Sequence, residues 1–372
     1  MKLSRFIFLS CFVILAACSK QPPVNDAGGA IAFSEPEVVA TRSGLIKETS
    51  QLLSGADELA YSVFASKYIP SATGAITAHE QFMNNVKVYT GMTDGVAGSE
   101  WLYDATPEED GLQPVFWTVG AAHKFFAAYP YYSSSDDTYD MGIKYEIDES
   151  KHSLKVTGNG SYIVAGTDES GKNECPDILY GTVLYEEPYS LLMDRGKVCF
   201  NLNHALAAVS FKIRNASEDN ITGVSEISFA GLKNKAAQLY FSESGAEWPQ
   251  TGELESHPDI KYIVPDISGV DDWSQGKYYS PSGRDYWYTG LVIPQNFADY
   301  DITLSFKVTF YGGSEKEYSL MLSEYRVGST AETQYAYSGG NHYIYNFDVT
   351  SSKITCTVSI VPWIEDQPIE LN

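Results

Sequence analysis

The chain has 372 residues, of which 44% are hydrophobic, 20% charged and 13% aromatic, a composition that excludes a disordered or collagen-like protein. The length predicts two domains. Its 48 Asp and Glu residues outnumber its 25 Lys and Arg residues, and the formal net charge of −23 would repel a phosphate backbone, so we expect no nucleic-acid partner.

The N-terminus has the pattern of an export signal. Two basic residues precede an apolar run, residues 6–17, which is too short to cross ~30 Å of hydrocarbon as a stable helix. The run ends in Leu15-Ala16-Ala17-Cys18, which resembles a bacterial lipobox, where a cysteine thiol receives a diacylglycerol. We therefore expect residues 1–17 to be a lipoprotein signal peptide and Cys18 to be lipidated, with a plain signal peptide as the alternative.

Residues 19–29 are rich in Gln, Pro, Asn and Gly and carry little apolar area, so they are expected to form a tether. Downstream, no apolar run approaches the ~18 residues that a membrane-spanning helix needs. Once the signal has left and Cys18 is acylated, three cysteines remain: Cys175, Cys199 and Cys356. They are expected to be small buried hydrophobes, and whether two of them form a disulfide stays open.

The body of the chain alternates apolar and polar residues with a period of two, which predicts strands with one buried face. The clearest run is residues 302–310, where Ile302, Leu304, Phe306, Val308 and Phe310 alternate with polar residues. The same pattern recurs at residues 198–202, 209–213, 343–349 and 354–360. The last of these runs places Cys356 on a core-facing side.

Glycine- and asparagine-rich turn signals separate these runs, and helical periodicity is confined to short stretches within 46–53 and near 204–208. Regularly spaced strands with polar turns predict antiparallel β-sandwiches. The front half is rich in loops and tyrosines, whereas longer strands follow Gly196. This change predicts an N-terminal β-sandwich domain at 46–196 and a C-terminal one at 197–372.

Motifs for catalysis and cofactor binding are weak. Residues 166–172 fit the G-x-x-x-x-G-K pattern of a phosphate-binding loop, but Asn173 and Glu174 follow where the loop needs a hydroxyl and a helix start. The six His residues are widely dispersed, which argues against a zinc site. We expect no cofactor, no metal and no enzyme activity, although scattered carboxylates leave a hydrolase as a remote alternative.

Several segments carry a family resemblance through their order along the chain. A Thr41-Arg42 pair follows the tether, and the aromatic run 125–130 and the segment 175–181 come later. The other matching segments are residues 61–65, 82–88, 101–103, 116–117, 198–207 and 342–363. Together with the lipobox, this set resembles the fimbrillins, or Mfa-like proteins, of Bacteroidetes, which build type V pili.

The resemblance implies two tandem transthyretin-like antiparallel β-sandwich domains, in agreement with the all-β reading of the strands. It implies a structural subunit, or a minor tip or anchor component, of a type V fimbria that supports adhesion. The partners would be other fimbrial subunits, outer-membrane lipid through Cys18, and a host protein or glycan receptor. The protein would be an outer membrane lipoprotein first and part of a cell-surface fimbrium later. His204 and the aromatic residues of these motifs would be structural.

The resemblance also implies assembly by protease-triggered donor-strand exchange, in which an emptied groove accepts a strand from another subunit. In this chain the region 18–45 would be a lipidated tether followed by a removable N-terminal strand. Its apolar residues Ile31, Phe33, Val38 and Val39 are expected to fill the groove. Arg42, between Thr41 and Ser43, is the expected cleavage site, with an ordinary surface arginine as the alternative.

Two questions stay open at this stage. Only residues 364–372 follow Trp363, and Pro368 interrupts them, so stalk, tip and anchor roles all fit. The Tyr and Trp residues within 273–288 suggest a different function, a lipid-anchored cell-surface module that binds glycans by stacking on sugar rings.

Overall fold

The computed structural model describes residues 27–38, 58–70, 76–93, 96–97, 101–104, 114–132, 143–158, 161–166, 177–216, 221–257, 259, 262–263, 266–267, 270, 273, 277–279, 290–324 and 335–362. Of the residues singled out above, Cys18, Val39, Arg42, Cys175 and Trp363 lie outside these ranges, as does the helix expected within 46–53.

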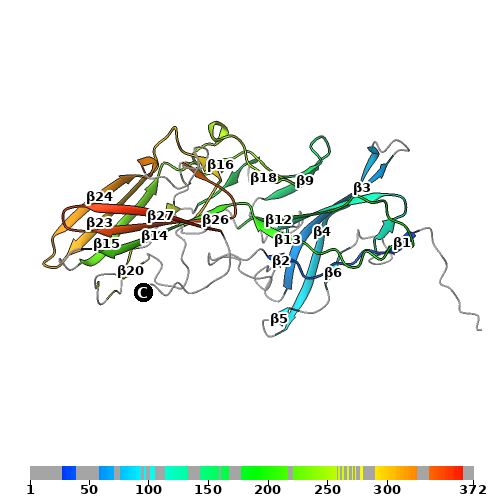
Figure 1. Ribbon diagram of the computed structural model, residues 1–372, viewed down its shortest axis with the longest axis horizontal. Helices are drawn as coiled ribbons and strands as arrows, with labels where there is room; N and C mark the ends of the chain where they lie inside the picture. The colour runs from blue at the N-terminus through cyan, green and yellow to red at the C-terminus, as the bar shows by residue number, and fades with distance from the viewer. Residues whose placement is uncertain are drawn as a thin grey trace, which may run out of the picture.

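The regular secondary structure of the described residues is almost wholly β-strand, which confirms the all-β fold class. Within it, the helical residues form two short 3-10 turns, η4 (Thr251–Glu253) and η5 (Leu322–Glu324). The molecule is elongated, with the strands of the N-terminal and C-terminal halves at opposite ends (Figure 1). Most strand pairs are antiparallel; the pairs β13–β2 and β14–β26 are parallel. The transthyretin-like form of two tandem domains stays a prediction.

The C-terminal half contains two sheets whose inner faces share one core. The first has the order β20 (Tyr278–Tyr279), β14 (Ala207–Asn215), β26 (Asn341–Val349), β27 (Ile354–Pro362), with β21 (Gly290–Val292) also paired to β14. The second has the order β19 (Tyr262–Ile263), β15 (Ile221–Ala230), β23 (Thr303–Phe310), β24 (Glu315–Met321). A small pair, β22 (Gln295–Asn296) with β25 (Ala336–Tyr337), accompanies them.

Strand β23 shows why the period-two pattern was informative here. Its residues are alternately buried and half-buried along the whole strand, so the strand expected over 302–310 is confirmed. Phe306, at its centre, is buried and lies 5.8 Å, centroid to centroid, from Phe347 of the facing sheet. Burial of an aromatic side chain of this size contributes about 1.5–3 kcal/mol.

The N-terminal half is organised around one large sheet. Its strand order is β2 (Glu37–Val38), β13 (Asn201–His204), β12 (Leu179–Tyr185), β8 (Ala122–Tyr129), β3 (Glu58–Pro70), β4 (Ile76–Thr93), β5 (Val96–Ala97), with β6 (Leu102–Tyr103) paired to β4. Around it lie the pair β1 (Ala27–Ala30) with β7 (Phe116–Thr118), the four-stranded sheet β18 (Gly245–Glu247), β17 (Leu239–Ser242), β10 (Ser153–Thr157), β9 (Lys144–Asp148), and the pair β11 (Ile163–Val164) with β16 (Lys235–Ala236).

Both faces of the central strands β8 and β3 of this large sheet are buried. In β8, Phe125 belongs to one hydrophobic cluster and its neighbour Phe126 to another, on the opposite face of the strand. Strand β3 divides its residues in the same way, with Val63 on the Phe125 side and Phe64 on the Phe126 side. A strand covered on both faces has a continuous apolar sequence, which explains the aromatic run at 125–130.

The candidate helical stretch near residues 204–208 is not a helix. His204 ends β13, and Ala207 begins β14 only two residues after Ala205. The first five residues of β14 are all buried, because both faces of this part of the strand are covered. An apolar run of that kind cannot be told from a buried helix by its periodicity.

The chain passes between the two halves just after the predicted boundary at residue 196. Strand β13 still belongs to the N-terminal sheet, whereas β14 belongs to the C-terminal one. The Phe126 cluster also contains Leu206, Phe241 and Ile293, which lie beyond that boundary in the sequence. The division into domains at 196–197 stays a prediction.

Candidate functional site

The first described segment, residues 27–38, lies in a groove of the N-terminal half. Strand β1 pairs antiparallel with β7, through Ala27 with Thr118 and Ala30 with Phe116. Strand β2, at the other end of the segment, pairs in parallel with β13. Between them, Phe33 forms bridges to Trp101 on one side and to Val198 on the other. The segment therefore completes sheets that other parts of the chain begin.

Backbone hydrogen bonds hold the segment along its length. The Ile31 amide donates to the Val115 carbonyl at 2.7 Å. On the opposite edge, the Val198 amide donates to the Ala32 carbonyl at 2.8 Å and the Ser34 amide to the Val198 carbonyl at 3.0 Å. Further along, the Glu37 amide donates to the Phe200 carbonyl at 2.8 Å. This main-chain pairing depends on strand geometry more than on side-chain identity, as in other cases of strand addition.

Alternate side chains of the segment enter the core. Ile31, Phe33 and Pro36 are buried, and Phe33 has no exposed surface. The Phe33 ring lies 5.4 Å from Tyr103, 6.4 Å from Phe125 and 6.3 Å from Phe200, centroid to centroid. The segment thus fills an aromatic pocket with one side chain and pairs its backbone with strand edges on both sides.

The loop that joins β12 to β13, residues 186–200, forms one wall of the groove. Tyr189 accepts a hydrogen bond from the Gly29 amide on its hydroxyl at 3.2 Å. Its own amide donates to the Ala121 carbonyl, and its carbonyl accepts from the Gly120 amide, each at 2.8 Å. Val198 and Phe200 of the same loop supply the parallel edge described above.

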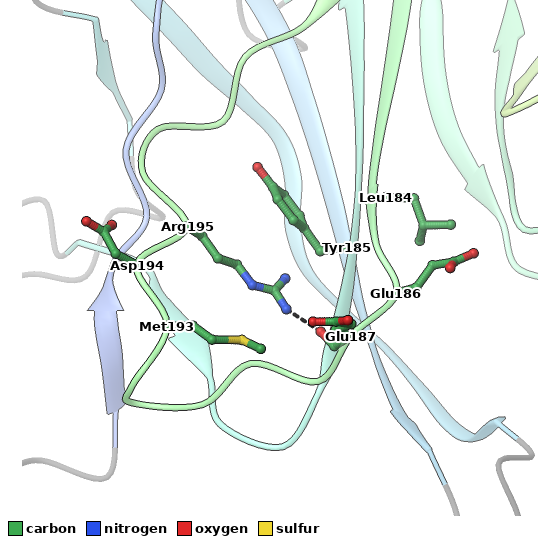
Figure 2. Close-up of a pocket in the computed structure, with 7 residues that line it drawn as sticks. All are labelled: Leu184, Tyr185, Glu186, Glu187, Met193, Asp194 and Arg195. Atoms are coloured by element: carbon green, nitrogen blue, oxygen red, sulfur yellow. Dashed lines mark hydrogen bonds between the residues drawn. The ribbon is translucent and has the colours of Figure 1, made fainter.

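Arg195 stabilises this loop through ring contacts and a hydrogen bond. Its guanidinium lies 4.7 Å from the centroid of the Tyr185 ring, 5.2 Å from that of Trp117 and 5.6 Å from that of Tyr189. It also donates to the carbonyl oxygen of Glu187. Figure 2 shows the side chain pointing toward Glu187, with Tyr185 on one side and Met193 on the other. The surrounding cavity has a volume of about 560 Å³.

A buried histidine lies beside this loop. The Thr118 amide donates to Nε2 of His123 at 3.1 Å, and the Trp117 ring packs 5.0 Å from the imidazole. Burial, and secondarily the positive charge of Arg195, lowers the pKa of His123 to about 4. The imidazole is therefore neutral at physiological pH, and its role is packing.

A second buried histidine, His204, has a partner that the sequence analysis did not identify. Nδ1 of His204 lies 2.7 Å from Oδ2 of Asp177, and both side chains are buried. Asp177 precedes β12 and His204 ends β13, so the contact fastens the two strands where they pair through Leu179 and His204. Gly181, two residues after Leu179 in β12, must be a glycine, because a Cβ at this position would lie 2.7 Å from the backbone oxygen of Asn201.

The predicted site residues have different outcomes. The structure places Ile31 and Phe33 in the N-terminal core and Val38 in β2, whereas Val39, Arg42 and Cys18 lie outside the described residues. The expected burial of Cys199 is wrong, because this thiol is exposed. Its Sγ contacts the Glu35 carbonyl at the edge of the groove, on the outward side of the chain. Cys356 is half-buried against the C-terminal core, and burial raises its pKa to about 12.

The described aromatic residues of 273–288 belong to the fold. Trp273 is only 5% exposed and packs against Tyr279. Tyr278 donates a hydrogen bond to Asp348, which also receives two from Arg214. Within the described ranges, no three His, Cys, Asp or Glu side chains gather as metal ligands would. In the same part of the chain, no helix is long and apolar enough to cross a membrane.

The described part of the chain is all-β, and its N-terminal segment is hydrogen-bonded to neighbouring strands on both edges. The sequence matches the fimbrillin-like family over residues 60–363, so the chain belongs to this family. No curated protein matched the chain.

Solved structures resemble this chain at low sequence identity. A fimbrial protein from Bacteroides vulgatus is 15% identical, with a TM-score of 0.51 over 90% of this chain and 99% of its own. A fimbrial assembly protein from Parabacteroides distasonis is 9% identical, with a TM-score of 0.36 over 90% and 100%. The tip fimbrial protein Mfa3 from Porphyromonas gingivalis, with a C-terminal truncation, is 11% identical, with a TM-score of 0.32 over 82% and 94%.

Proposed function

We propose that this protein is a fimbrial subunit whose N-terminal segment is exchanged for a strand of another subunit during assembly. The observation that carries the proposal is the seating of residues 27–38: this segment is hydrogen-bonded on both edges and inserts Phe33 into an aromatic pocket. The role requires a groove and a strand, and it requires no catalytic residue. The partners would be other fimbrial subunits, and the mature protein would belong to a cell-surface fimbrium that supports adhesion.

The segment suits removal because residues 39–57 are its covalent connection to β3 and the rest of the described fold. Residues 39–57 separate its end at Val38 from β3, and Arg42 lies within that interval. A cut after Arg42 would leave the segment held by hydrogen bonds and side-chain packing alone. The two arginines with described side chains, Arg195 and Arg214, are engaged by aromatic rings or by Asp348.

Loss of the segment would leave an unstable surface. Val115, Val198 and Phe200 would lose backbone partners, and Tyr103 and Phe125 would lose the ring that covers them. Unpaired edges beside an apolar groove recruit strands from other chains. The segment would thus keep the precursor monomeric until a protease removes it.

Before processing, we propose that Cys18 carries a lipid that retains the precursor at the outer membrane. This part rests on the lipobox and on the family. Stalk, tip and anchor roles are all compatible with the proposed groove, because each requires a subunit that accepts or retains a strand.

The decisive experiment is limited digestion of the chain from Ser19 to Asn372 with an arginine-specific protease, followed by light scattering. We expect one early cut after Arg42, retention of β-structure, and growth of oligomers as the segment dissociates. Arg42→Ala should stay monomeric, and Lys47→Ala, which removes a cation from the same 39–57 interval, should be cut and polymerise as the parent does. A cut chain that loses residues 19–42, keeps its fold and remains monomeric would contradict strand exchange.

A further inference from the structure

Four exposed apolar side chains lie at the end of the N-terminal half where the groove segment begins. Leu191 and Leu192, in the β12–β13 loop, are 53% and 99% exposed. Phe116 of β7 and Val119, just after that strand, are also exposed. We name these four residues the apolar tip.

The two elements that carry the apolar tip are fastened together. Val119 and Tyr189 form a parallel bridge, and the Gly120 amide donates to the Tyr189 carbonyl at 2.8 Å. The Met193 amide donates to the Ser190 carbonyl at 2.9 Å, which puts Leu191 and Leu192 at the centre of a tight turn. Their exposure is therefore a consequence of ordered backbone, and exposed apolar side chains held on two fastened elements suit an interaction site.

The position of β1, where the described chain begins, indicates which surface the apolar tip faces. Ala27, the first residue of β1, pairs with Thr118, the neighbour of Val119. Cys18 lies nine residues before Ala27, so a lipid on Cys18 is at most about 32 Å of extended chain away. The turn between β23 and β24 is at the opposite end of the molecule from β1 (Figure 1).

We propose that the apolar tip rests in the surface of the membrane that holds the lipid of Cys18, and thereby orients the precursor with its C-terminal half pointing away from the membrane. The inference rests on the proposed lipidation of Cys18. The anchor supplies the attachment and a high local concentration of lipid, so a contact that is too weak to bind alone suffices to select one orientation.

The charges near the tip limit the kind of lipid. Glu186, Glu187 and Asp194 lie in the same loop and line the cavity around Arg195 (Figure 2). These three carboxylates outnumber the two cations of the loop, Arg195 and Lys197, so anionic headgroups would be repelled weakly and the tip fits a zwitterionic surface. Phosphatidylcholine vesicles are the matching probe.

The test places an environment-sensitive fluorophore on the tip of the lipidated chain. Leu192→Cys is labelled in a background of Cys175→Ser, Cys199→Ser and Cys356→Ala, and the protein is reconstituted in phosphatidylcholine vesicles with or without spin-labelled acyl chains. We expect a blue shift and at least a twofold loss of fluorescence with the spin-labelled lipid. Tyr311→Cys is the matched control, since Tyr311 is 80% exposed in the β23–β24 turn, and its probe should stay in water.

A second measurement uses the unsubstituted chain. Amide hydrogen exchange of residues 186–200 should slow when the lipidated protein is on vesicles, while the β23–β24 turn should be unchanged. Protein that floats with the vesicles but leaves the Leu192 probe as aqueous as the Tyr311 probe would overturn the orientation alone. Protein that does not float and carries no acyl group on Cys18 by mass spectrometry would overturn the lipidation and, with it, the inference.

Discussion

Truncation of Phe33 tests how strongly the groove holds its segment. Phe33→Ala removes a side chain that has no exposed surface and that contacts the rings of Tyr103, Phe125 and Phe200. A buried Phe→Ala change costs about 3–5 kcal/mol, and the three ring contacts favour the upper part of that range. Main-chain pairing of the segment is retained, so the variant should still fold with the segment in place.

The cost should appear in two measurements. In the uncut chain, the free energy of unfolding measured in urea should fall by about 3–5 kcal/mol. After the cut at Arg42, the same deficit should favour release of residues 19–42 by a factor of about 10² to 10⁴, since each 1.4 kcal/mol is tenfold. Size exclusion with mass spectrometry measures how much segment remains bound.

This substitution carries its own control. Once the segment has left, the variant and the parent are the same molecule, residues 43–372, so their stability and their rate of polymerisation must coincide. The reasoning is refuted if Phe33→Ala changes the unfolding free energy by less than about 1 kcal/mol, the size of an ordinary surface substitution. It is equally refuted if the cut variant retains its segment as firmly as the parent.

Three further predictions concern other parts of the chain. Cys18→Ala should abolish acylation and shift the protein from the detergent phase to the aqueous phase, because the lipobox cysteine is the expected acyl acceptor; continued detergent partition would contradict the lipobox. Phe306→Ala should lower the unfolding free energy by about 3–5 kcal/mol in chemical denaturation, because the ring is buried between two sheets. Burial keeps His123 neutral with a pKa of about 4 against 6.5 in the unfolded chain, so the unfolded state binds more protons between these values. Stability should therefore fall as the pH drops from 6.5 to about 4, by up to roughly 3 kcal/mol, and His123→Phe should flatten that dependence in urea titrations at several pH values.

The strands that could be predicted from sequence are those with one buried face. Strand β23 alternates along its whole length because one side of it contacts the C-terminal core, and β26 alternates in its second half, from Tyr345 to Val349. Strand β8 and the start of β14 lose the alternation because both of their faces are covered. Their burial depends on neighbours that lie far away in the chain, so local periodicity could not distinguish strand from helix at residues 204–208.

The candidate site could be predicted only in part from the sequence, for the same reason. Ile31 and Phe33 form an apolar pattern that indicates a buried strand, but their neighbours Val115, Val198 and Phe200 are contributed by distant segments. The β12–β13 loop contains charged residues and resembles a solvated turn in the sequence. Nothing local indicates that Arg195 is held between aromatic rings, or that Asp177 meets His204 across the β12–β13 pair.

The geometry of the groove also limits how exchange can proceed. Phe33 is fully buried and the backbone on either side of it is paired, so simultaneous loss of every contact would expose aromatic rings and several unpaired backbone groups at once. A stepwise replacement avoids this cost, because an incoming strand can take over each hydrogen bond as the resident segment gives it up. The cut at Arg42 would free the β2 end, where Glu37 and Val38 pair in parallel with β13. Replacement should therefore start at β2 and end at β1, and substitutions near Phe200, whose carbonyl accepts from the Glu37 amide, should slow its early steps more than substitutions at Tyr189, which contacts the segment at Gly29.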